Sequence, residues 1–107
     1  MSVADADIAH ALDLFAPLGG LSSRRMMGGL SIYRDGQIFA ILSGDGTIYL
    51  KASGAFAKTM QAAGARQFSM VNKQGVARSM GYWTLPDAAL DDADLACDWA
   101  RRALEQL

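Results

Sequence analysis

The chain has 107 residues, of which 51% are hydrophobic and 20% are charged, and its formal net charge is −1. These values are typical of a single globular domain, which we expect to span residues 1–107. No apolar run is long enough for a membrane-spanning helix, and the one cysteine, Cys97, excludes an intrachain disulfide. Because the first residues include Asp5 and Asp7 but no lysine or arginine, we expect no secretory signal. Together with the missing membrane span and the single cysteine, this predicts no membrane partner and a cytoplasmic location.

The charges are unevenly distributed along the chain. Residues 1–20 carry a net charge of −3 and residues 84–107 a net charge of −4, whereas residues 21–83 carry +6. The acidic ends fit the first turns of helices, where aspartate stabilises the helix dipole. The basic middle has two interpretations, which are outward-facing lysines and arginines on strands or a surface for an anionic partner.

The N-terminal segment is predicted to form the first helix, because Ile8, Leu12 and Phe15 recur at helical spacing. A proline and two glycines then end the helix before residue 21. Residues 21–23 contain no periodic apolar pattern, and we expect them to form a connector.

Two Asp-Gly pairs separate three apolar or aromatic runs between residues 24 and 52. Asp-Gly between such runs is a strong hairpin signal, because a type I′ turn needs positive φ at both central residues. We therefore predict a three-stranded antiparallel meander with the strands Met27–Arg34, Gln37–Ser43 and Thr47–Ala52. Two-residue turns at both Asp-Gly pairs set these partners: Tyr33 with Ile38, Ile32 with Phe39, Leu42 with Tyr49, and Ile41 with Leu50.

This register sorts the side chains of the meander onto two faces. The first face is apolar and is predicted to be core: Leu30, Ile32, Phe39, Ile41, Ile48 and Leu50. The second face is mixed: Ser31, Tyr33, Ile38, Ala40, Leu42, Thr47, Tyr49 and Lys51. A one-residue change at the second turn would exchange the faces of the third strand. Because large apolar and aromatic residues occupy the second face, we expect a second copy to cover it about a two-fold axis, or alternatively a helix that crosses to this side.

The remaining chain predicts a helix from Ser53 to about Ala63, strands at Gln67–Val71 and Val76–Trp83, and a last helix after Asp91. We expect Trp99 to be buried between the last helix and the sheet. The element order is α-β-β-β-α-β-β-α, which is an α+β domain with helices packed against a five-stranded antiparallel sheet.

Residues that could carry chemistry are not grouped in the sequence. The single histidine, His10, and Cys97 lie in different predicted helices, the carboxylates gather at helix starts, and no nucleophile-elbow motif is present. Arg25 with Gly28 and Gly29 is a candidate anion site, although a bulged strand with Arg25 in a local ion pair is the preferred interpretation. We therefore predict no catalytic residue, no metal, no cofactor and no enzymatic activity.

Several segments together resemble the N-terminal domain of the TfoX/Sxy competence regulators. They are Arg25-Met26-Met27-Gly28-Gly29, residues 33–40, residues 49–52, Tyr82-Trp83-Thr84-Leu85-Pro86 and residues 99–104. The resemblance runs from about Leu14 to Leu107. It implies a two-layer α-β(3)-α-β(2)-α fold like that of secretion chaperones, and the chain looks like a stand-alone N-terminal domain because full regulators carry a second, helical domain. The family's regulators assist a cyclic-AMP-responsive transcription activator.

Three functions are open at this point, ranked in the order given. The first is a protein-interaction module in transcriptional regulation, forming a homodimer and contacting a protein such as a transcription activator. The second is nucleic-acid binding through the basic residues of the middle: Arg24, Arg25, Lys51, Lys58, Arg66, Lys73 and Arg78. The third is small-molecule binding or an enzymatic role through Arg25, Tyr33, Lys51 and Tyr82. The candidate binding residues are Arg25, Gly28, Gly29, Tyr33, Tyr49, Lys51, Arg78 and Tyr82.

Overall fold

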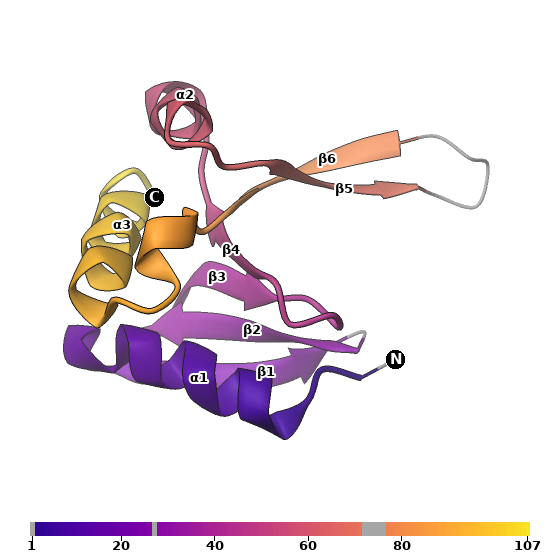
Figure 1. Ribbon diagram of the computed structural model, residues 1–107, viewed down its shortest axis with the longest axis vertical. Coiled ribbons are helices and arrows are strands. Elements are labelled where there is room, and N and C mark those ends of the chain that lie inside the picture. Colours follow the sequence, from indigo (N-terminus) through magenta and orange to yellow (C-terminus); the bar gives the residue numbers. More distant parts are fainter. Residues whose placement is uncertain (1, 27, 72–76) are drawn as a thin grey trace.

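The computed structural model describes residues 2–26, 28–71 and 77–107, with side chains described outside residues 69–80 (Figure 1). Three α-helices, two short 3₁₀ helices and six strands follow one another along these residues. Their bounds, in chain order, are α1 Asp5–Phe15, η1 Ala16–Leu18, β1 Leu21–Met26, β2 Gly29–Arg34, β3 Gln37–Leu42, β4 Ile48–Lys51, α2 Gly54–Ala62, β5 Gln67–Val71, β6 Ala77–Thr84, η2 Asp87–Ala89 and α3 Ala93–Glu105.

The strands form one antiparallel sheet in the order β1-β2-β3-β4-β6-β5. The predicted α+β class is therefore confirmed, but the sheet has six strands and not five. The additional strand is β1, which pairs with β2 from Leu21 opposite Arg34 to Met26 opposite Gly29. This strand was not predicted because its exposed serines and arginines give no alternating apolar pattern. β1 is an edge strand, and charged side chains on edge strands resist pairing with further strands.

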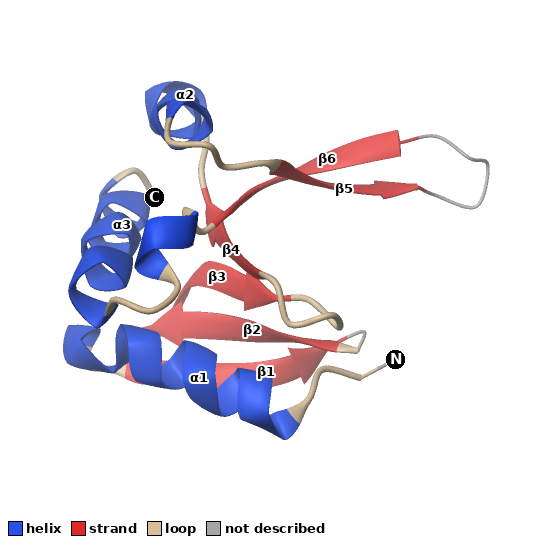
Figure 2. Ribbon diagram, viewed as in Figure 1, coloured by secondary structure: helices blue, strands red, loops and turns tan. Residues whose placement is uncertain are grey.

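The helices pack against one face of this sheet (Figure 2). The rings of Phe15 on α1 and Phe39 on β3 meet edge to face with centroids 5.3 Å apart, and both side chains are fully buried. Helix α3 lies against α1, β3 and β4, whereas α2 contacts β6. The side chains that the strands contribute to this core are Leu30, Ile32, Phe39, Ala40, Leu42, Ile48 and Leu50.

A β-bulge in β3 changes the predicted register. Tyr33 lies opposite Ile38 as predicted, but Ile32 lies opposite Ala40, so Phe39 is an extra residue on β3. Because a bulge shifts the alternation of the strand that carries it, both Phe39 and Ala40 are buried.

The second turn is also longer than predicted. Leu42 lies opposite Ile48, so residues 43–47 form the turn, closed by a hydrogen bond from the Ser43 N–H to the Thr47 carbonyl (2.9 Å). The predicted pairs of Leu42 with Tyr49 and of Ile41 with Leu50 are therefore wrong. In place of them, Ile41 lies opposite Tyr49 on the second face, and Leu42 belongs to the core.

Small residues on α3 decide what that helix presents to the sheet. Ala96, Ala100 and Ala103 are completely buried, so the helix approaches closely and leaves no room there for a large ring. Trp99 is accordingly half-buried between α3 and α2, with its ring 6.1 Å from the ring of Phe56. The expectation that Trp99 would be buried against the sheet is wrong.

The register can be tested with two single substitutions on β3. Leu42 is 1% exposed in the core, so Leu42→Ala is expected to lower the free energy of unfolding by about 2–5 kcal/mol. Ile41→Ala removes a half-buried side chain from the other face and is expected to cost about half as much. Urea denaturation of both variants measures the difference, and a larger loss for Ile41→Ala would restore the predicted register.

Candidate binding site

An apolar groove occupies the sheet face that carries none of the described helices. The β5–β6 hairpin and the strands β1–β3 diverge from β4, so this face is concave (Figure 1). The groove has a volume of about 310 Å³. We call it the concave groove, and its lining residues are Met26, Gly29, Leu30, Ile38, Ile41, Leu42, Ser43, Gly44, Phe68 and Tyr82. Of these, Leu30 and Leu42 also belong to the core.

Ser31, on β2 next to the groove-lining Leu30, is a buried polar side chain that is internally satisfied. Ser31 is fully buried, and its hydroxyl donates a hydrogen bond to the sulfur of Met26. A buried hydroxyl without a partner would be costly, and this contact removes that cost.

Aromatic side chains line the hairpin side of the groove and continue beyond it. The rings of Phe68 and Tyr49 meet edge to face with centroids 4.8 Å apart. Burial raises the pKa of Tyr82 above 10.0, and the nearby Tyr33 adds to the effect. Burial likewise raises the pKa of Tyr49, with a further contribution from Asp45 and an opposing one from Arg66. Tyr82 and Tyr49 thus stay neutral at physiological pH.

Four of the candidate residues lie on this face. Tyr33 and Tyr49 belong to β2 and β4, and Lys51 lies directly opposite Tyr82 across the β4–β6 pair. The face also contains Met26, Ile41 and Phe68, which the sequence did not single out as binding residues. Ile41 was predicted to be in the core from regular strand alternation. The bulge moves it to this face, and the sequence carries no clear signal for the bulge.

Of the other candidate residues, Gly29 lines the concave groove, whereas Arg25 and Gly28 do not. Arg25 makes an exposed ion pair with Asp5 of α1 (3.1 Å). A local ion pair was the interpretation preferred over an anion site. Gly28 has a φ of +83° in the turn before β2, and a Cβ on Gly29 would collide with the backbone carbonyl of Leu42. The eight candidates therefore do not form a single cluster, and the side chain of the eighth, Arg78, lies outside the described residues.

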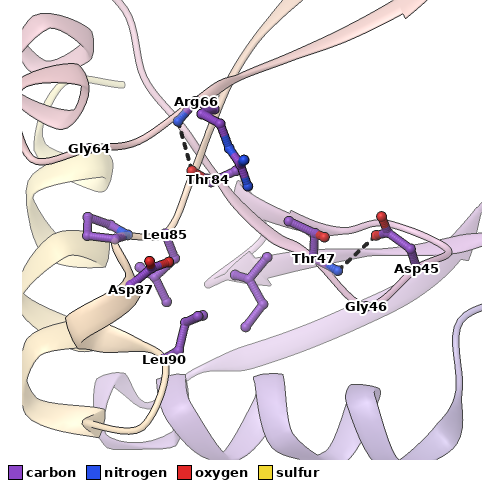
Figure 3. Close-up of a pocket in the computed structure, with 11 residues that line it drawn as sticks. Asp45, Gly46, Thr47, Gly64, Arg66, Thr84, Leu85, Asp87 and Leu90 are labelled. Carbon is purple, nitrogen blue, oxygen red and sulfur yellow. Dashed lines mark hydrogen bonds between the residues drawn. The ribbon is translucent and has the colours of Figure 1, made fainter.

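A second, more polar pocket of about 420 Å³ lies where three connecting segments meet (Figure 3). We call it the Arg66 pocket, and its lining residues are Asp45, Gly46, Thr47, Ile48, Gly64, Arg66, Thr84, Leu85, Pro86, Asp87 and Leu90. Hydrogen bonds from the Ser43 hydroxyl and the Thr47 N–H hold the pKa of Asp45 below its usual 3.8, so this carboxylate is ionised at neutral pH. In the sequence, Arg66 is distinguished only as one of the basic residues between residues 21 and 83.

The histidine and the cysteine occupy separate places in the fold. Exposed His10 is hydrogen-bonded through Nε2 to the carbonyl oxygen of Leu90 (2.8 Å). The thiol of Cys97 is buried and donates to the carbonyl of Leu14 (3.2 Å), and burial raises its pKa. Across the residues that the structure describes, no group of three or more His, Cys, Asp or Glu side chains is placed to hold a metal ion.

A comparison with protein families identifies the chain. The family model described as the TfoX N-terminal domain matches residues 13–107. The chain belongs to the TfoX N-terminal domain family. In a comparison with curated proteins, none matches the chain. The matched range agrees with the resemblance seen in the sequence, which began at about Leu14.

The concave groove and the Arg66 pocket are both features of this TfoX N-terminal domain. The matched range includes every residue that lines either of them. None of the helices in the described ranges combines the length and the apolar character that crossing a membrane requires.

The buried tyrosine of the groove gives a pH-dependence that can be measured. Because the folded state holds the Tyr82 proton more tightly, the unfolded chain deprotonates first, and the free energy of unfolding is expected to fall as the pH rises above 10. Urea denaturation at about pH 9 and about pH 11 should show a smaller fall for Tyr82→Phe than for the wild type. An identical fall in the two proteins would contradict this assignment.

Proposed function

We propose that this TfoX N-terminal domain is a non-enzymatic, cytoplasmic regulatory module that acts in transcription through protein contacts made by the concave groove. The family supports a domain of the competence-regulator type. The observation that carries the proposal is the apolar lining of an open sheet face, formed by Ile38, Ile41, Phe68 and Tyr82. Outward-facing residues of a solvated antiparallel sheet are normally polar, so such a lining favours a contact surface.

The chemistry of the groove suits a protein partner. Ile38, Ile41 and Phe68 are only half-buried, so a partner can remove further apolar surface from water. Tyr33 and Tyr49 add rings with polar tips, a combination that protein interfaces favour.

A second copy of the chain is the occupant that we propose for this face, with a transcription activator as the further protein partner. A two-fold axis would let the same face serve both copies. The edges of the sheet formed by the described strands are β1 and β5, which flank the concave face. A dimer would therefore cover apolar side chains and bring strand edges of the two copies near each other.

Light scattering tests the dimer. Tyr49→Glu places a charge beside Phe68 and is expected to give a folded monomer, whereas the wild type is expected to be a dimer. Gln61→Glu, which adds the same charge on an exposed part of α2, is the matched control and should remain dimeric. Circular dichroism reports folding, and a wild type that stays monomeric at high concentration would contradict the dimer.

Nucleic-acid binding is the second candidate, supported by the basic middle of the chain. Arg25 is already paired with Asp5, and Lys58 lies on α2, away from the arginines of β1. We therefore expect no DNA binding at physiological salt. Fluorescence anisotropy with labelled duplex DNA measures it, and tight binding that weakens steeply with salt and with Lys51→Ala would reverse this ranking.

A further inference from the structure

The Arg66 pocket is a separate cavity with walls of its own. It is built by the β3–β4 turn, the connection between α2 and β5, and the segment from Thr84 to Leu90. It shares no lining residue with the concave groove. Its volume of about 420 Å³ falls within the range of about 300–1,000 Å³ that small-molecule sites occupy.

Hydrogen bonds fix the three segments to one another. Arg66 and Thr84 exchange two of them, from the Arg66 N–H to the Thr84 hydroxyl (2.9 Å) and from the Thr84 N–H to the Arg66 carbonyl (2.8 Å). The Leu85 N–H donates to the carbonyl of Ile48 (2.9 Å), which ties the third segment to β4. The pocket is therefore formed before any ligand arrives, so a ligand pays little to organise it.

The charged groups of the pocket are arranged around Arg66. In Figure 3 the Arg66 side chain extends between Asp87 on one side and Asp45 with Thr47 on the other. The ion pairs found among the described residues are Arg25–Asp5 and Arg101–Asp98, so the Arg66 guanidinium is not paired with either pocket carboxylate. Because guanidinium presents a planar fork of donors, it suits a carboxylate ligand.

The two aspartates have different roles. The Asp45 carboxylate already accepts hydrogen bonds from the Ser43 hydroxyl and the Thr47 N–H, so it shapes the turn. Asp87 is exposed at the first position of η2 and can face a cation in the pocket. With one arginine against two aspartates, the charged lining is net negative, which disfavours a doubly charged anion such as phosphate.

Four apolar residues complete the lining. Ile48 and Leu85 are 4% and 2% exposed and belong to the core, Pro86 is buried as well, and Leu90 is half-buried. We propose that the Arg66 pocket binds a free α-amino acid with an aliphatic side chain. The ligand's carboxylate meets the Arg66 guanidinium, its ammonium group meets Asp87, and its side chain packs against Leu90, the apolar lining residue that is only half-buried.

Four probes separate this ligand class from its alternatives. Leucine carries both charges, N-acetyl-leucine lacks the ammonium, leucinamide lacks the carboxylate, and inorganic phosphate is the doubly charged anion. Backbone amide NMR on the ¹⁵N-labelled full chain should show that leucine shifts Thr47, Arg66 and Thr84 in a saturable way. Each single-charge analogue should bind at least about tenfold more weakly, which is about 1.4 kcal/mol.

Substitutions then assign the two charges. Arg66→Gln and Asp87→Asn should each weaken leucine binding at least about tenfold, while Arg24→Gln, a change at an exposed arginine on β1, should leave it unchanged. The dispersion of the amide spectrum shows whether each variant is folded. If Arg66→Gln does not fold, Asp87→Asn still tests the site.

Three results would overturn the proposal. They are no leucine-induced shift at these amides, equal binding of phosphate or of a single-charge analogue, and full binding by a folded Arg66→Gln or Asp87→Asn variant. Because the pocket and the groove share no lining residue, none of these results bears on the proposed protein contacts.

Discussion

The extra residue that β3 accommodates at Phe39 determines which side chains of this TfoX N-terminal domain reach the core and which reach the groove. The bulge keeps the Phe39 ring against Phe15 of α1, a packed aromatic pair that contributes about 0.5–1.5 kcal/mol beyond its buried area. It also reverses the alternation of the strand beyond it, so Leu42 joins the core and Ile41 turns to the opposite face. The apolar lining of the groove is therefore linked to the packing of the helix on the other side.

Local signals in the sequence were sufficient for most of the fold. The Asp35-Gly36 turn was predicted correctly, and Asp35 has the positive φ of +50° that such a turn requires. The same dipeptide at Asp45-Gly46 was misleading, because there the Asp45 carboxylate binds the Thr47 N–H and stabilises a longer turn. Side-chain hydrogen bonds of this kind compete with the tight turn, and nothing in the flanking residues reveals which will form.

The candidate sites were less predictable than the fold for a geometric reason. Tyr33, Tyr49 and Tyr82 share a face because strand alternation places them there, and sequence reasoning can follow that alternation. The Arg66 pocket instead depends on three segments that are distant in the chain and meet only after β6 has paired with β4. Arg66 was consequently one basic residue among several until its neighbours were known.

The strand order has a consequence for how the domain assembles. Strands β1 to β4 follow one another in sequence and in space, so they can form a local meander at little loop-closure cost. Strand β6, by contrast, joins β4 through partners such as Tyr49 and Thr84, which lie far apart along the chain, and contacts of this kind slow folding. We expect the hairpin to dock after the meander. Ile41 comes from the meander and Tyr82 from the hairpin, so the groove forms only after the hairpin has docked. A partner that binds the groove therefore recognises the folded domain and not a partly folded chain.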